Sequence, residues 1–166
     1  AASDVYKRQL YYMTRDRVFA GGEGKIFASP EEVRMAYDSG VADLQAKIKV
    51  RMSTEPGKEP ELIETTVGRV LLREVVPESI PFSHINRVMA KKQVSALIDT
   101  CFRIAGNKET VILADRLKET GFRCMNPELG MGNRLEDLSQ AADMVQMGVG
   151  HDDPLDMGEL EPQPLD

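Results

Sequence analysis

The sequence lacks tryptophan and has only two cysteines and two histidines, and aromatic residues make up 5% of its 166 positions. So few scattered cysteines and histidines predict neither a disulfide framework nor a zinc site. No stretch approaches the roughly 18 consecutive apolar residues of a transmembrane helix. No charged-then-apolar leader is visible either. We therefore expect a cytoplasmic chain with no membrane contact, and a core of Val, Ile, Leu, Met and Ala side chains.

Negative charge is concentrated at one end of the chain. The formal net charge is −6, but residues 124–166 contain ten acidic residues and one arginine, which leaves residues 1–123 with +3. From Gly148 onward Asp, Pro, Gly and Gln dominate, a composition that predicts a largely disordered acidic tail. Such asymmetry marks either a functional tail or two unrelated pieces joined together.

A well-delimited helix is predicted between Ser29 and Gly40. Ser29 is a typical N-cap, Pro30 suits the first helical position, and Glu32 completes a Ser-x-x-Glu capping box. Gly40 is expected to end the helix. The expected apolar face consists of Val33, Ala36 and Tyr37.

Strict alternation from Leu44 to Met52 predicts a half-buried strand. A loop over residues 53–61 and a return strand from Leu62 to Thr66 would complete an antiparallel pair. Leu10 to Val18 is interpreted as a further strand or buried extended segment, and residues 20–24 as a turn. The outward side chains of the strand are Gln45, Lys47, Lys49 and Arg51. They form either a solvated face or a contact for phosphate or another subunit.

Two amphipathic helices follow. The first is closed by Gly106, and its apolar positions at i, i+3, i+4 and i+7 spacing include Cys101 as a buried thiol. The second runs from Thr110 to Thr120 and ends at Gly121. The expected inward residues are Val94, Leu97, Ile98, Cys101, Ile104, Leu113, Ala114 and Leu117.

Seven short blocks, in one order, resemble the largest subunit of bacterial DNA-directed RNA polymerase, beta-prime, over about residues 10–123. The first is Leu-Tyr-Tyr-Met-Thr-Arg-Asp (10–16). The others are Ser-Pro-Glu-Glu-Val (29–33), Lys-Ile-Lys-Val-Arg (47–51), Glu-Thr-Thr-Val-Gly-Arg (64–69), Ile-Pro-Phe-Ser (80–83), Ile-Asp-Thr-Cys (98–101) and Thr-Val-Ile-Leu-Ala-Asp (110–115). The resemblance implies that the segment belongs to the pore domain. Residues 67–76 by themselves suit either a helix or a strand, and the resemblance favours a helix that is ended by Pro77.

The expected fold class is α+β: a small mixed domain with a short antiparallel sheet and several helices, followed by the acidic tail. Residues 1–9 match nothing in the family and are interpreted as an adaptor-derived scar; the alternative is a short disordered or strand-forming terminus. Residues 10–123 form the pore-like domain. Residues 124–166 form a tail of uncertain origin, because the family pattern fails after Arg123.

The resemblance implies that catalysis lies outside this chain. In the family, magnesium is held by Asn-Ala-Asp-Phe-Asp-Gly-Asp, which does not occur here. No catalytic residue, metal ligand or cofactor is therefore assigned within the chain, which is expected to be inactive alone. The run from His151 to Asp156 lacks the alternating acidic pattern and central Gly of a calcium loop.

Lys91 and Lys92 are the candidate ligand-binding residues. They begin the strongest helix, where free backbone N–H groups favour anions. In the family the matching helix lies near the omega subunit and a guanosine-tetraphosphate alarmone pocket, so Lys91 would match a phosphate-contacting lysine. Phe102, where a Tyr is usual, departs from that pattern. The alternative is two solvated lysines on an exposed first turn.

Arg15 and Arg69 are candidates for structural or phosphate-facing roles, with buried pairing to a carboxylate as the alternative. The implied function is to help form the secondary channel, which admits nucleoside triphosphates and receives the extruded RNA 3′ end. Implied partners are the beta and omega subunits, the remainder of beta-prime, DNA and RNA. Two alternatives remain open: a free-standing module that docks on polymerase or nucleic acid, and a chimeric reading frame.

Overall fold

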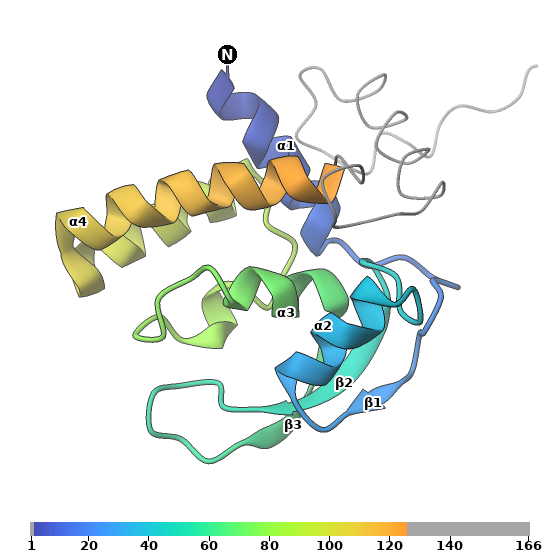
Figure 1. Cartoon of the computed structure of the whole chain (residues 1–166). Helices are drawn as coiled ribbons and strands as arrows, with labels where there is room; N and C mark the ends of the chain where they lie inside the picture. The colour runs from blue at the N-terminus through green and yellow to red at the C-terminus, as the bar shows by residue number, and fades with distance from the viewer. Residues whose placement is uncertain (1, 126–166) are drawn as a thin grey trace, which may run out of the picture.

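The computed structural model describes residues 2–125, which form one α+β arrangement (Figure 1). The expected fold class is confirmed, whereas residues 126–166, with most of the expected acidic tail, lie outside the described residues. In chain order the elements are α1 (Ala2–Thr14), β1 (Ile26–Phe27), α2 (Pro30–Asp38), β2 (Lys47–Met52), β3 (Glu61–Thr66), α3 (Val67–Arg73), the 3-10 helix η1 (Phe82–His84) and α4 (Lys91–Met125).

The sheet has three strands in the order β1-β2-β3. The predicted antiparallel pair is present, with Lys47 opposite Thr66 and Met52 opposite Glu61. The short strand β1 was not expected. It pairs parallel to β2, with Ile26 opposite Lys49, because α2 carries the chain back across the sheet before β2 begins. The sheet is therefore mixed.

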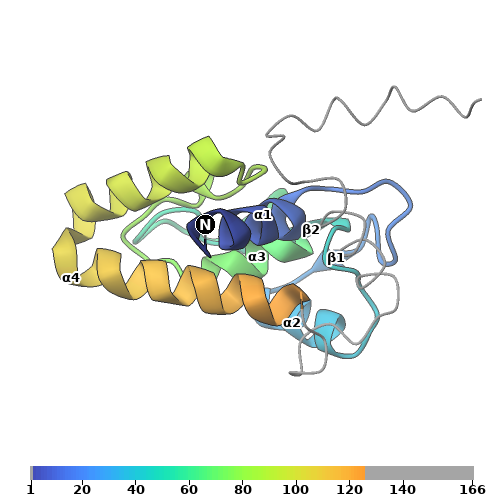
Figure 2. The ribbon, with the colours of Figure 1, turned by 90° about the horizontal axis from the view of Figure 1, so that it is seen from above.

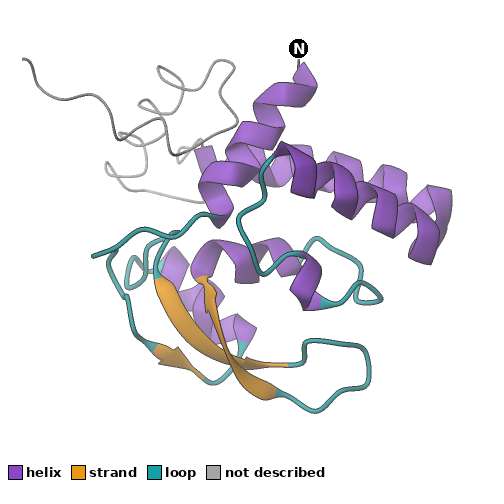
Figure 3. Ribbon diagram, turned by 180° about the vertical axis from the view of Figure 1, so that it is seen from behind, coloured by secondary structure: helices purple, strands orange, loops and turns teal. Residues whose placement is uncertain are grey.

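Helices α2 and α3 cover one face of the sheet. The alternation of β2 places Ile48, Val50 and Met52 in the core, and the predicted apolar face of α2 is buried against them. Seen from behind, the strands lie in front of these helices (Figure 3). The β2 side chains on that side, Lys47, Lys49 and Arg51, are exposed.

The strand expected from Leu10 to Val18 is wrong, because residues 2–14 form the helix α1. Tyr6, Leu10 and Met13 are all buried, and their i, i+4, i+7 spacing is that of one helical face. Setting residues 1–9 aside as a scar hid this pattern. The origin of those residues stays a prediction, but Tyr6 packs close to α4, with the Lys118 ammonium 5.9 Å from its ring centroid.

The two predicted C-terminal helices are the halves of α4, which fold back on each other as a hairpin (Figures 1 and 2). Gly106 separates them, with φ 87° and ψ 178°, so the predicted stop there is confirmed. The predicted stop at Gly121 is wrong: the helix continues to Met125, and a Cβ at Gly121 would lie 2.9 Å from Gln9 Oε1 of α1. Ile104, expected inward, is exposed near the hairpin tip.

Replacing Gly106 by Ala tests the hairpin break. The observed φ and ψ lie in a region that essentially only glycine occupies, and a side chain there costs about 1–3 kcal/mol. No atom lies within 4 Å of the added methyl group, so the loss would come from backbone strain alone. We expect Gly106→Ala to lower the free energy of unfolding by that amount in urea denaturation. An unchanged unfolding midpoint would contradict the hairpin geometry.

Candidate functional site

Thr14, at the end of α1, joins three segments that are far apart in the sequence. Its hydroxyl donates to Leu10 O at 2.7 Å and accepts the N–H of Met89 at 2.8 Å. Its carbonyl oxygen accepts from Arg69 Nε at 2.9 Å. The residue is fully buried. Helix α1, the start of α3 and the segment leading into α4 are thus held at one point, which we call the Thr14 junction.

The last turn of α1 is buried, so its carbonyl groups need partners from elsewhere in the chain. Gln45 Nε2 donates to Tyr12 O at 2.7 Å, in addition to the bond from Arg69 to Thr14 O. Gln45 was expected on the exposed strand face but is 1% exposed. It precedes β2, where the strict alternation has not yet begun.

The start of α3 approaches α1 very closely. Thr66 caps α3, because its side chain accepts the N–H of Arg69 at 3.3 Å. A Cβ added at Gly68 would lie 1.8 Å from Met13 O, so no side chain fits there. The blocks at 10–16 and 64–69, which carry much of the family resemblance, therefore meet in space.

The structure gives Arg69 and Arg15 mainly backbone and ring contacts. Burial lowers the pKa of the Arg69 guanidinium, while the charge of Asp16 acts in the opposite direction. The guanidinium carbon of Arg15 lies 5.8 Å from the Tyr12 ring centroid, within cation–π range. Arg69 thus has a structural role as a cap for α1, and a phosphate-facing role for either arginine stays a prediction.

Lys91 and Lys92 are the first two residues of α4, and both are exposed. The bond from Met89 N to Thr14 ties the residues just before them to the junction. Arg15 follows Thr14 directly and Arg69 bonds its carbonyl oxygen, while Lys91 and Lys92 follow Met89 by two and three residues. All four predicted site residues therefore lie at or near members of the junction along the chain. No spacing pattern along the chain indicates this grouping, although Thr14 and Gly68 both stand inside the family blocks.

The aspartates of residues 2–125 do not come together as a metal-binding cluster. Asp43 accepts from Gly21 N at 2.7 Å and pairs with Arg17 at 3.3 Å, and Asp16 pairs with Lys47 at 3.4 Å. Within residues 2–125, no group of three or more His, Cys, Asp or Glu side chains could hold a metal ion. The run from His151 to Asp156 lies outside the described residues. In the same described range no helix is long and apolar enough to cross a membrane.

The chain belongs to the family described as RNA polymerase Rpb1, domain 3, whose model matches residues 9–128. It is also 56% identical, over 113 residues, to the DNA-directed RNA polymerase subunit beta′ of Syntrophobacter fumaroxidans. That match covers 68% of this chain and 8% of the relative. The resemblance expected from the seven blocks is confirmed, and the chain corresponds to a small segment of a much longer largest subunit.

Thr14→Val tests the junction with little change in shape. The variant leaves the buried N–H of Met89 without an acceptor, which costs about 1–3 kcal/mol. Thr14→Ser is the matched control, because it keeps the hydroxyl and loses one methyl group, worth about 0.8 kcal/mol. We expect the valine variant to have the lower free energy of unfolding in urea titrations. Equal stability of the two variants would count against the junction.

Gly68→Ala tests the close approach of α3 to α1. The methyl group would overlap a backbone oxygen that cannot move without displacing α1, so we expect a loss above about 4 kcal/mol, in the range of severe core defects. Gly106→Ala is the matched control, since it adds the same methyl group in open space. Thermal unfolding followed by circular dichroism distinguishes the two. A Gly68→Ala protein as stable as this control would be incompatible with the described packing.

Proposed function

We propose that residues 10–123 form part of the wall of the secondary channel in the largest subunit of a DNA-directed RNA polymerase. The observation that carries the proposal is 56% identity over 113 residues to a beta′ subunit. The net charge of +3 on residues 1–123 suits a passage for polyanionic nucleotides, which must be attracted without being trapped. In this role the segment admits nucleoside triphosphates and receives the RNA 3′ end when the enzyme backtracks.

Nucleotidyl transfer itself would take place outside this chain. Two-metal catalysis needs clustered carboxylates that hold both ions close to the reacting oxygens. The aspartates of the described residues are dispersed, and Asp16, Asp43 and Asp99 are engaged in ion pairs. They do not fit a magnesium centre. The chain therefore contributes structure to a cytoplasmic enzyme whose magnesium is held elsewhere, together with the beta and omega subunits and the remainder of beta-prime.

A chimeric largest subunit tests this proposal. Residues 10–123 would replace the matching segment of the Syntrophobacter subunit, and the chimera would be assembled with the other subunits of that polymerase. We expect assembly and RNA extension on a DNA template, whereas the 166-residue chain alone extends no RNA. The Gly68→Ala chimera, in which the segment is strongly destabilised, is the negative control. Failure of the unmodified chimera to extend RNA, with the segment folded, would refute the proposal.

Lys91 and Lys92 would contact phosphate groups of a guanosine-tetraphosphate alarmone in the assembled enzyme. Both are exposed at the N-terminus of a long helix, where free N–H groups and lysine charges act together on an anion. Phe102 is exposed on the same half of α4. Its ring cannot donate the hydrogen bond that a tyrosine would supply, so the lysines and backbone would carry more of the binding.

Lys91→Ala/Lys92→Ala in the chimeric polymerase tests this contact. Hydrogen bonds to charged groups contribute about 1.5–3 kcal/mol each, so we expect at least a tenfold weaker affinity for guanosine tetraphosphate. Lys108→Ala, an exposed lysine in the other half of α4, is the matched control and should leave the affinity unchanged. Equilibrium binding at fixed salt measures both. An equal affinity of the double variant and the control would exclude the contact.

A further inference from the structure

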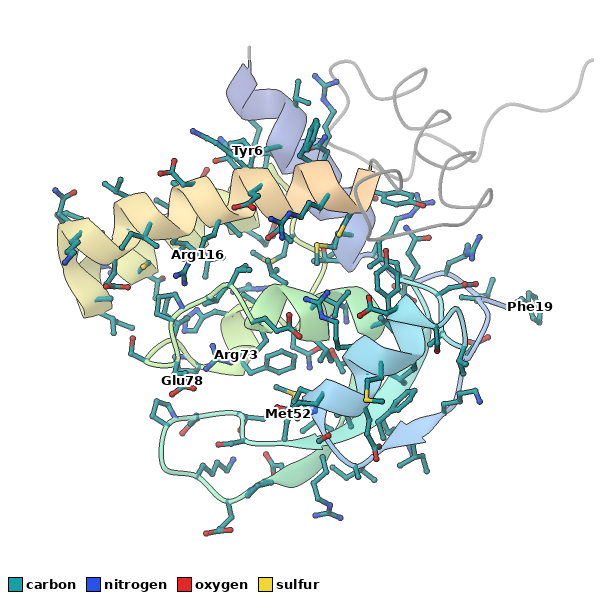
Figure 4. All side chains as sticks on the ribbon, in the orientation of Figure 1. Tyr6, Phe19, Met52, Arg73, Glu78 and Arg116 are labelled. Atoms are coloured by element: carbon teal, nitrogen blue, oxygen red, sulfur yellow. The ribbon has the colours of Figure 1, made fainter. Side chains whose placement is uncertain are left out.

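Phe19 is the most anomalous surface residue of the described chain. It has a positive φ of 61°, the left-handed region that bulky side chains seldom adopt. Its side chain is 94% exposed, and it projects away from the body of the molecule (Figure 4). Its N–H donates to Glu23 Oε2 at 2.9 Å, which holds the loop in this conformation. A strained backbone that presents an aromatic ring to solvent is a reason to look for a function.

Exposed apolar and basic side chains also lie beside Phe19 in the chain and on β1 and β2. Val18 and Ile26 are 70% and 66% exposed. Ile26 stands opposite Lys49 in the register of β1 and β2, and Arg51 lies two residues further along the same exposed face of β2. We call these five residues, Val18, Phe19, Ile26, Lys49 and Arg51, the Phe19 face. In the view from behind, no helix of the described chain lies in front of the strands (Figure 3).

The two cations of the Phe19 face, Lys49 and Arg51, are not held in ion pairs by the described residues. Lys47, their neighbour, pairs with Asp16 at 3.4 Å. Lys49 stands opposite Glu64 in the β2–β3 register, yet neither it nor Arg51 forms an ion pair with any of residues 2–125. Carboxylates of a partner would complement these charges, which steers association and fixes register.

We propose that the Phe19 face docks against a protein surface on which carboxylates surround an apolar pocket, and that the pocket receives the Phe19 ring. Aromatic side chains that fill such pockets dominate the binding energy of many interfaces. Nucleic acid fits less well, because the remaining apolar side chains of the face are aliphatic and offer no second ring for base stacking.

The partner surface belongs to the rest of the assembly. The segment corresponds to 8% of its beta′ relative, so most of the surface that could contact it lies outside this chain. The inference rests on membership of the polymerase family and does not require that the segment line a channel.

Photo-crosslinking at position 19 tests the docking. The chimeric largest subunit, with p-benzoylphenylalanine in place of Phe19, would be irradiated both alone and in the assembled polymerase with bound nucleic acid. We expect a protein adduct in at least one of the two, mapped by mass spectrometry to a region rich in Asp or Glu around apolar residues. The same group at Met35, which is 69% exposed on α2, is the matched control for unspecific capture.

Charge reversal gives the second part of the test. Lys49→Glu/Arg51→Glu should lower the adduct yield at least threefold, whereas Lys108→Glu should leave it unchanged. Adducts no more abundant than at Met35, adducts with nucleic acid, or a yield indifferent to charge reversal would each overturn the proposal.

Phe19→Asn separates docking from folding. Asparagine tolerates the left-handed conformation better than phenylalanine, so the melting temperature of the full chain should stay the same or rise. In a competition assay, the wild-type chimera should suppress the adduct of the labelled subunit at least threefold more effectively than the Phe19→Asn chimera. Equal competition would show that the ring makes no contact, and a lower melting temperature would show that its exposed position serves the fold instead.

Discussion

The described chain depends on the satisfaction of a buried helix end. The last turn of α1 lies in the core, and carbonyl groups there would each forfeit hydrogen bonds to water on folding. Gln45 and Arg69 supply donors to Tyr12 O and Thr14 O, while the Thr14 hydroxyl accepts the N–H of Met89. An unsatisfied buried polar group costs about 1–3 kcal/mol, against a typical total stability of about 5–15 kcal/mol. Losing two of these bonds would remove a large part of the stability.

The junction also sets the geometry of everything attached to it. Gly68 allows α3 to approach the end of α1 more closely than any side chain would permit. Because α3 follows β3 directly, that contact fixes the sheet relative to α1. The bond to Met89 N fixes where α4 begins, and so places Lys91 and Lys92. The candidate phosphate contacts are therefore positioned by the polar network of the Thr14 junction.

Local patterns predicted much of this fold, and the failures have physical causes. Neighbouring residues determine the cap at Ser29, the alternation in β2 and the break at Gly106. Each of these features could therefore be predicted from the sequence. The helical structure of α1 was not predicted because its apolar face includes Tyr6, which lies in residues 1–9, the segment interpreted as an adaptor-derived scar. Gln45 and Gly121 were misjudged because their roles come from tertiary contacts: Gln45 turns inward to bond Tyr12, and Gly121 makes room for Gln9. No local pattern reports such long-range contacts.

The bonds of the Thr14 junction also constrain the order of folding. The two long-range bonds join residues separated by 55 and 75 positions along the chain. The entropy lost in closing a loop rises with its length, and contacts between distant residues slow folding. During synthesis the carbonyl groups at the end of α1 gain their donors only when Gln45 and Arg69 have left the ribosome, and the Thr14 hydroxyl receives the N–H of Met89 later still. The end of α1 is thus among the last parts of the described chain to form all of its native hydrogen bonds.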